Sequence, residues 1–260
     1  MFNKHARLII AIDGPAGSGK SSTAKALAKR MGLPYIDTGA MYRAVTLKAV
    51  REGVSFEDVP ALIKLSKKAS IHFEGSSPEK QKVFLDKKDV TEAIRHPELT
   101  KNVFHVAQEP LIRREMVKKQ KALGRKAGGV MEGRDIGTMV FPNADHKFYF
   151  EANPQIRAKR RHRELVQAGK NDTFETVAQD LKRRDETDFK REEGPLRKAK
   201  DAVLIDTSSL TIDETVDKIL QVIESKSFPP KNAADPPRAG KTSPLRGRPT
   251  RRPRAVSRIP

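Results

Sequence analysis

Residues 7–31 read RLIIAIDGPAGSGKSSTAKALAKRM, and this stretch decides the fold. Arg7–Asp13 is an almost continuous apolar run, as expected of a strand that is buried on both faces of a sheet. Lys20–Met31 has apolar residues at helical spacing, and Gly32 follows it as a C-cap. Between strand and helix, Gly14–Ser21 matches the pattern G-x-x-x-x-G-K-S/T in full. A strand, a glycine-rich loop and a helix in this order predict a phosphate-binding P-loop.

Each part of this loop has a physical role in holding a purine nucleoside triphosphate. Its glycines let the backbone curl so that successive N–H groups point inward, and the helix N-terminus adds about half a positive charge. Lys20 is expected to reach the β- and γ-phosphates, and the Ser21 hydroxyl is expected to bind Mg²⁺. The residues expected to bind the triphosphate are Gly14, Pro15, Ala16, Gly17, Ser18, Gly19, Lys20, Ser21 and Ser22.

Beyond this unit, strand-like and helix-like segments alternate, which is typical of an α/β fold with a parallel sheet. Residues 70–94 interrupt the alternation, because Ser70–Glu74 and Lys82–Leu85 read as two strands of a small antiparallel insertion, with a turn at Asp86–Asp89. Further strands are expected at Leu33–Asp37, Gly129–Gly133, Lys147–Glu151 and Ala202–Asp206, and further helices at Gly39–Glu52, Pro97–Gln108, Pro110–Lys126, Pro154–Ala168, Thr173–Arg191 and Ile212–Ser225.

The composition excludes several classes of function. The 260 residues include no Cys, which rules out disulfide scaffolds, thiolate metal sites and Cys nucleophiles. The six His form no pattern of metal ligands. The apolar run Leu8–Ile12 is shorter than the roughly 7–15 residues of a signal-peptide core or the about 20 of a membrane helix. We therefore expect a soluble, cytoplasmic protein with no membrane partner, and a monomer by default.

The net charge of +19 is spread unevenly along the chain. Residues 226–260 hold ten Lys and Arg, one acid and eight of the seventeen Pro, with few large apolar side chains. Such a segment buries too little surface to offset the entropy of ordering it, so we predict a disordered basic tail. The tail is either a solvated extension or a sequence-independent contact for nucleic acid phosphates.

Two motifs follow expected strands, where ligands of open α/β sheets bind. Asp37–Arg43 reads DTGAMYR and offers a hydroxyl at a helix start with an Arg one turn later, suited either to a second phosphate or to an ordinary N-cap. Glu132-Gly-Arg134-Asp135 follows another strand. Its Arg could clamp a phosphate and Asp135 could accept from an amine, or the two could form a salt bridge at the strand end.

Basic residues also gather on the last two long helices before residue 200. Arg157, Arg160 and Arg161 lie at i, i+3 and i+4, so they crowd one arc of a helix. Arg184 and Arg191 share one face of the next helix with Asp188. Like charges at this spacing destabilise a bare helix, which favours a bound anion; a solvated face with an Arg–Asp pair is the alternative.

Together these motifs resemble one family, the bacterial cytidylate (CMP) kinases among the nucleoside monophosphate kinases. The matching segments are GPAGSGKSS, IDTGAMYRA, MEGRDIGTMVFPNA, RAKRR, RRDETDFKR and PLRKAKDAVLIDTS, which occur in this order within residues 5–224. The resemblance implies a three-layer P-loop fold with a five-stranded parallel sheet, an inserted antiparallel subdomain and a helical lid. It implies a kinase domain over residues 1–225, with a CMP-binding region at about 38–110 that carries the inserted sheet at about 70–94, and a lid at about 154–192.

The resemblance also implies a reaction, the transfer of the γ-phosphoryl group of ATP to CMP or dCMP with Mg²⁺, as part of pyrimidine nucleotide metabolism. The residues that it implies for catalysis are Lys20, Arg157, Arg160 and Arg161. Those that it implies for the monophosphate are Thr38, Tyr42, Arg43, Arg113, Arg134, Asp135, Arg184, Asp188 and Arg191.

Two residues depart from the family pattern. Glu132 stands where many members have Asp, which keeps the carboxylate but lengthens the side chain by one methylene. Phe104 stands where some relatives have a Ser that contacts cytosine. A phenyl ring cannot supply that hydrogen bond, although it could stack on the base. A P-loop kinase for UMP or AMP therefore stays open as an alternative, as does a basic P-loop protein that binds nucleic acid.

Overall fold

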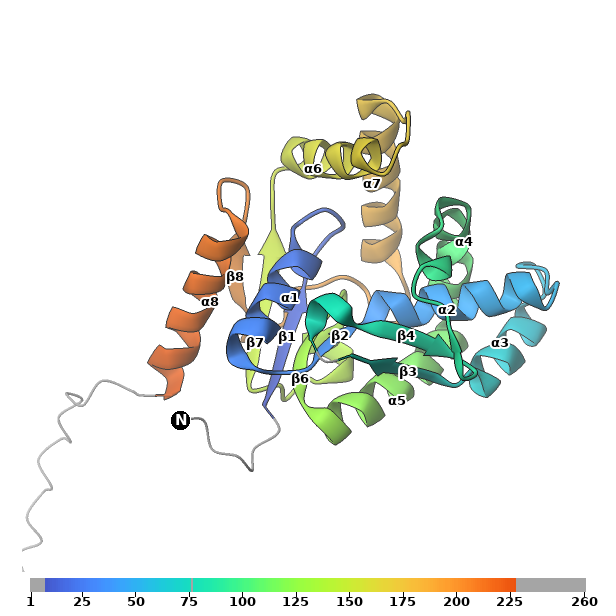
Figure 1. Cartoon of the computed structure of the whole chain (residues 1–260), viewed down its shortest axis with the longest axis horizontal. Helices are drawn as coiled ribbons and strands as arrows, with labels where there is room; N and C mark the ends of the chain where they lie inside the picture. The colour runs from blue at the N-terminus through green and yellow to red at the C-terminus, as the bar shows by residue number, and fades with distance from the viewer. Residues whose placement is uncertain (1–7, 76, 228–260) are drawn as a thin grey trace, which may run out of the picture.

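A five-stranded sheet forms the main body of the computed structural model, which describes residues 8–75 and 77–227 (Figure 1). Its strands lie in the order β2-β6-β1-β7-β8, and every neighbouring pair is parallel. The strands are β1 (Ile9–Asp13), β2 (Tyr35–Asp37), β6 (Gly129–Gly133), β7 (His146–Glu151) and β8 (Val203–Asp206). The predicted α/β fold with a five-stranded parallel sheet is confirmed.

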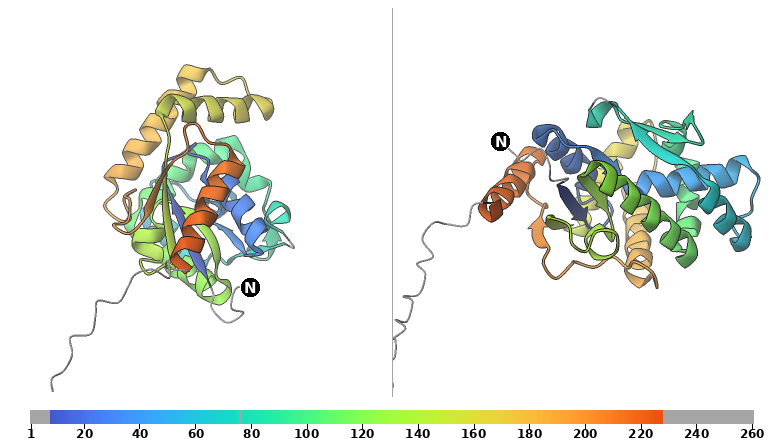
Figure 2. Two further views of the ribbon diagram at one scale, coloured as in Figure 1. Left: turned by 90° about the vertical axis from the view of Figure 1, so that its left-hand side faces the viewer. Right: turned by 90° about the horizontal axis from the view of Figure 1, so that it is seen from below.

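Helices cover both faces of this sheet and make three layers (Figure 2). The α1 helix (Lys20–Met31) and α8 (Ile212–Ser227) share one buried apolar core with Ile10 and Ile12 of β1. The intervening residue of β1, Ala11, faces the opposite core, which is built with α5 (Pro110–Ala127) and the π-helix η3 (Ile136–Val140). This alternation follows from the two-residue period of a strand. Because the five strands are parallel, their carboxyl ends lie at the same end of the sheet.

A second core lies beside the sheet and contains the predicted insertion. The helices α2, α3 and α4 pack there with α5 and a small antiparallel sheet in the order β3-β4-β5. The bounds are α2 (Thr38–Arg51), α3 (Val59–Lys68), α4 (Pro97–Gln108), β3 (Ile71–Glu74), β4 (Lys82–Leu85), β5 (Lys88–Asp89), and the 3₁₀ turns η1 (Pro78–Lys80) and η2 (Ala93–Arg95). The antiparallel insertion that the sequence predicted is confirmed.

Two helices project from the end of the sheet that carries the P-loop (Figures 1 and 2). They are α6 (Pro154–Gln167), which follows β7, and α7 (Phe174–Lys190). Ala158 of α6 packs against Val177 and Leu181 of α7 in a small apolar cluster of their own. None of the helices within residues 8–75 and 77–227 is long and apolar enough to cross a membrane.

The structure differs from the sequence prediction in the second core. The α3 helix was not predicted; it begins with Pro60 in its first turn and is capped by the Asp58 carboxylate, which accepts from the Ala61 N–H. The expected turn at Asp86–Asp89 is shorter, because only Asp86 and Lys87 take left-handed φ values, of 49° and 67°, and the next two residues form β5. The predicted disordered tail lies outside the described residues, apart from residues 226 and 227 at the end of α8.

Candidate active site

The loop before α1 has the geometry of an anion-binding nest. Gly14, Gly17 and Gly19 have φ values of +151°, +72° and +82°, which L side chains rarely adopt. A Cβ on Gly14 would lie 2.3 Å from the Phe150 carbonyl oxygen, so this close approach also requires glycine. The α1 helix begins without a side-chain cap, and its first N–H groups are therefore available to a phosphate.

Lys20 lies inside this loop, and its side chain is only 5% exposed. Its Nζ donates to the Pro15 carbonyl oxygen at 2.5 Å and to the Ser18 hydroxyl at 3.3 Å. Burial lowers the pKa of Lys20 well below its usual value, and the positive charge of Arg134 lowers it further. A phosphate at this position would raise the pKa of Lys20 again, since its negative charge stabilises the buried ammonium.

A hydroxyl–carboxylate pair lies at the mouth of the loop. Ser21 Oγ donates to Glu132 Oε2 at 2.7 Å, and the Tyr35 hydroxyl donates to Glu132 Oε1. Burial raises the pKa of Glu132, and so does the nearby Asp37 carboxylate. Mg²⁺ prefers oxygen donors, binds to one or two protein groups and keeps phosphates and waters as its other ligands. The donor set fits Mg²⁺, and the described residues hold no cluster of three or more His, Cys, Asp or Glu arranged for a metal ion.

The first set of residues expected to bind the monophosphate lies at the carboxyl end of β2. Thr38 Oγ1 donates to the Glu132 carbonyl oxygen at 2.6 Å, which places this hydroxyl next to β6. The Asp37 carboxylate accepts from the Ala40 N–H at 2.9 Å and pairs with Arg43 at 2.6 Å. The N-cap interpretation of this motif is therefore confirmed, and the same carboxylate also orients the guanidinium of Arg43.

A second set of residues expected to bind the monophosphate links the end of β6 to α5 and α7. Arg113 Nη2 donates to Asp135 Oδ2 at 2.6 Å, and both residues are buried. Arg134 Nε donates to Asp188 Oδ2 at 2.6 Å, and Arg191 pairs with the other oxygen of Asp188. The salt-bridge alternative is therefore present, but Arg134 pairs with Asp188 of α7 and not with its neighbour in the sequence. These pairs bring three predicted arginines, Arg113, Arg134 and Arg191, close to one another at the end of β6.

Close packing and burial set the electrostatics of this group. A Cβ on Gly194 would lie 2.2 Å from Asp135 Oδ2, so only glycine allows the chain to pass this carboxylate. The Arg113 guanidinium lies 5.4 Å from the centre of the Tyr42 ring. Burial lowers the pKa of Arg191 to about 10, and the positive charges of Arg113 and Arg134 contribute to this shift. Closely spaced cations of this kind favour an anionic ligand.

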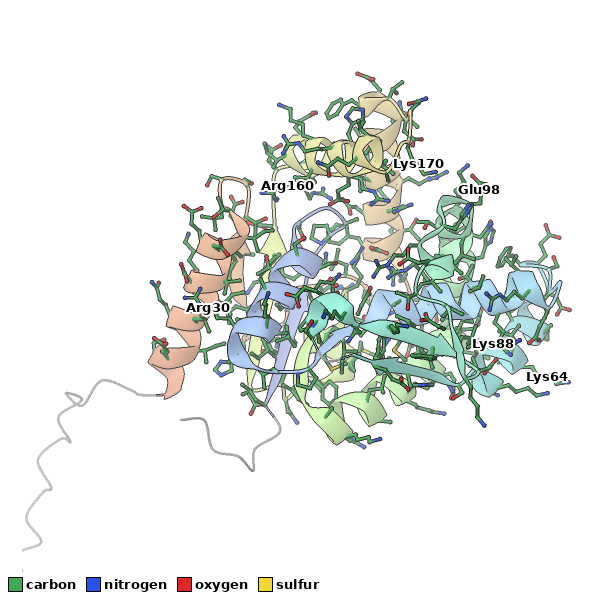
Figure 3. All side chains as sticks on the ribbon, in the orientation of Figure 1. Arg30, Lys64, Lys88, Glu98, Arg160 and Lys170 are labelled. Atoms are coloured by element: carbon green, nitrogen blue, oxygen red, sulfur yellow. The ribbon has the colours of Figure 1, made fainter. Side chains whose placement is uncertain are left out.

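Arg157 and Arg160 of α6 make contacts around the P-loop. Arg157 Nη1 donates to the Ala16 carbonyl oxygen at 3.0 Å and pairs with Asp185 of α7 at 2.7 Å. Arg160, labelled in Figure 3, donates to the Thr207 carbonyl oxygen at 2.6 Å. The Thr207 hydroxyl in turn donates to the Ser18 carbonyl oxygen at 3.0 Å. These contacts fasten the start of α6 to the P-loop.

Two further predicted arginines, Arg161 of α6 and Arg184 of α7, lie near each other. Arg161 pairs with Glu164 of its own helix at 3.0 Å. Burial lowers the pKa of Arg184, and the positive charge of Arg161 lowers it further. Arg161 and Arg184 therefore repel each other across α6 and α7, and an anion between them would relieve the repulsion.

Sequence reasoning missed three buried residues that shape the site. Asp13 ends β1 and accepts the N–H groups of Ile136 and Gly137 at 2.8 and 2.7 Å. Asp185 pairs with Arg157, and Tyr35 holds Glu132. An acid at the end of an otherwise apolar strand, directly before a P-loop, was the available signal for Asp13.

Phe104 lies on the outside of α4 and is 46% exposed. Its ring centre lies 3.8 Å from that of His105, which in turn stacks on Phe56. The exposed ring offers an apolar face and no hydrogen-bond donor.

The buried Asp13 carboxyl is expected to make the stability of the fold depend on pH. Burial raises its pKa from 3.8 to about 7, so the protonated form favours folding. This contribution to stability is fully present below about pH 4 and is lost as the pH rises through 7. We therefore expect the difference in Tm between wild type and Asp13→Asn to change between pH 5 and pH 8, with the wild type losing more stability as the pH rises.

Thermal unfolding across that pH range checks the expectation. Asp89→Asn is the matched control, because hydrogen bonds to Thr91 lower the pKa of Asp89 to about 2, below the range measured. A difference between wild type and Asp13→Asn that stays constant with pH would contradict a raised pKa for Asp13.

Lys20 and Arg157 lie at the P-loop, and the positive charge of Arg134 reaches Lys20 from the end of β6. This arrangement defines a small-molecule kinase of the P-loop class. The chain belongs to the cytidylate kinase family, whose model matches residues 10–225.

Relatives from several bacteria align with nearly their whole length. The cytidylate kinase of Bacillus licheniformis is 49% identical over 221 residues, which cover 85% of this chain and 98% of that protein. The cytidylate kinase of Bacillus subtilis is also 49% identical, with the same coverage. That of Geobacillus sp. strain WCH70 is 48% identical over 217 residues, or 84% of this chain and 96% of that protein.

Proposed function

We propose that this protein transfers the γ-phosphoryl group of ATP to CMP or dCMP and releases ADP with CDP or dCDP. The observation that carries the proposal is that cations from both sides lie near one P-loop, with the charge of Arg134 acting on Lys20. Lys20 and Arg157 lie on the ATP side, whereas Arg134 and Arg43 lie on the acceptor side. Membership of the cytidylate kinase family supports CMP as the acceptor.

The proposed mechanism relies on positioning and charge neutralisation. The acceptor is a phosphate oxygen that is already ionised at neutral pH, because the second pKa of a phosphomonoester is about 6. No general base is therefore required. Lys20 and the lid arginines Arg157, Arg160 and Arg161 offset negative charge on the transferring group. Ser21 and Glu132 would hold Mg²⁺, which when bound supplies positive charge at the phosphates of ATP.

The acceptor is held by the two groups around β2 and β6. We assign Thr38, Arg43 and Arg134, which lie at the ends of β2 and β6, to the phosphate of CMP. We also assign to the CMP site Tyr42, Arg113, Asp135, Arg184, Asp188 and Arg191. We assign about residues 38–110 to CMP binding and about 154–192 to a lid that excludes water, since water competes as a phosphoryl acceptor.

Product analysis tests the proposed function. The full-length protein is incubated with ATP, Mg²⁺ and CMP, and the nucleotides are separated and quantified. We expect ADP and CDP in equal amounts, with much less ADP when CMP is omitted. ADP release that does not depend on CMP would show an ATPase and would overturn the proposal.

A further inference from the structure

We propose that Tyr35 is a positioning residue for the metal site, because its hydroxyl group holds the Glu132 carboxylate in place beside Ser21. The inference rests on the proposed function, which assigns Mg²⁺ to Ser21 and Glu132. It adds a residue that the sequence motifs did not indicate.

The register of the sheet brings the two side chains together. In the parallel pair β2 and β6, Tyr35 lies opposite Val130 and Asp37 lies opposite Glu132. Residues two apart on a strand share a face, so Tyr35, Val130 and Glu132 all face α1. The Tyr35 side chain is 3% exposed, and its hydroxyl reaches along β6 to Glu132 Oε1.

The two oxygens of Glu132 therefore have different partners. Oε1 accepts from Tyr35, and Oε2 accepts from Ser21 at 2.7 Å. A glutamate side chain has several rotatable bonds, and the buried ammonium of Lys20 attracts this carboxylate. Without the Tyr35 hydroxyl, Oε1 would lose its donor, and the carboxylate could turn away from Ser21.

Tyr35 is itself fixed from two sides, which makes it a firm support. Gln81 Nε2, just before β4, donates to the Tyr35 carbonyl oxygen at 2.5 Å. Lys25 of α1 lies over the Tyr35 ring, with Nζ 5.6 Å from the ring centre. Residues that orient metal-binding side chains commonly affect metal affinity by about 10–100-fold, although they do not touch the metal.

Metal binding by Tyr35→Phe tests this role directly. The substitution removes only the hydroxyl group and keeps the buried ring. Mn²⁺ is titrated into full-length protein that is saturated with the non-hydrolysable ATP analogue AMP-PNP, and free Mn²⁺ is followed by electron paramagnetic resonance. We expect the Kd of Mn²⁺ to rise about tenfold, while the affinity for AMP-PNP in EDTA stays within about twofold of wild type.

The kinetic counterpart separates positioning from damage to the fold. In Tyr35→Phe we expect the Mg²⁺ concentration for half-maximal rate to rise by a similar factor, with kcat near the wild-type value at saturating Mg²⁺. Tyr149→Phe is the matched control, because Tyr149 is a buried tyrosine on β7 and the strand β1 separates it from β6. Its Mn²⁺ affinity should equal that of wild type.

A second variant shows whether Tyr35 acts through Glu132. Glu132→Ala removes the carboxylate that both hydroxyl groups contact, so adding Tyr35→Phe to it should change the Kd of Mn²⁺ by less than about twofold. A full tenfold effect in that background would overturn the proposed route. A lowered Tm in Tyr35→Phe with unchanged Mn²⁺ affinity would overturn the role itself. Product analysis of wild type tests the proposed function separately, since the Mn²⁺ titration needs no CMP.

Discussion

Lys20→Ala is expected to lower kcat for CDP formation by about 100-fold or more, as with other lost contacts to transition-state charge. Lys20 is the buried cation of the P-loop, and its present partners are the oxygens of Pro15 and Ser18. The substitution removes a charge that burial already disfavours, so we expect the variant to fold with a Tm close to that of wild type.

Steady-state kinetics with saturating ATP and CMP measure this effect. Lys29→Ala is the matched control on the same helix, because Lys29 is exposed and pairs with Glu79 at the surface at 3.0 Å. Surface pairs of this kind contribute little, so its kcat should stay within about twofold of wild type. Near-normal turnover in Lys20→Ala would contradict the mechanism.

Arg113→Met is expected to have the largest effect on stability, lowering the free energy of unfolding by about 3–5 kcal/mol. Arg113 is 1% exposed, and its guanidinium donates to Asp135 at 2.6 Å and to the Ala107 carbonyl oxygen at 3.1 Å. Methionine keeps the apolar stem but leaves Asp135 as a buried carboxylate without its partner. The KM for CMP should rise as well, because Arg113 belongs to the proposed acceptor site.

Denaturant unfolding measures the loss of stability, and the chain offers a neighbouring control. Arg114 is exposed and reaches Glu193 at 3.3–3.4 Å, so Arg114→Ala should cost no more than about 1 kcal/mol. Adding Asp135→Asn to Arg113→Met should cost less than the sum of the two single substitutions. A loss below about 1 kcal/mol for Arg113→Met would show that the buried pair does not hold α5 to the sheet.

Local patterns predicted much of the fold. The bounds of α4 and β6 agree with the sequence prediction, because Pro97 and Gly129 mark their first residues clearly. The α3 helix was missed although local signals mark it, since Asp58 caps its start and Pro60 lies in its first turn. Its place is decided by packing of Leu62 and Leu65 in the second core.

Local sequence patterns predicted which residues gather at the site, but not which of them pair with one another. Arg134 pairs with Asp188, 54 residues away, in preference to the adjacent Asp135. This pairing depends on how α7 lies relative to the end of β6, which local sequence patterns do not predict. Tyr35 was hidden for a similar reason, since a buried tyrosine in a short strand reads as core until the register places its hydroxyl beside Glu132.

The acceptor specificity of the wild-type protein tests the central claim most directly. ADP formation is measured with ATP, Mg²⁺ and either CMP, dCMP, UMP or AMP, each over a range of concentrations. We expect kcat/KM for CMP and dCMP to exceed the values for UMP and AMP by tenfold or more, which corresponds to about 1.4 kcal/mol. Equal values for UMP or AMP would contradict cytidylate as the acceptor, and would point to the exposed ring of Phe104 as the place where this chain departs from its family.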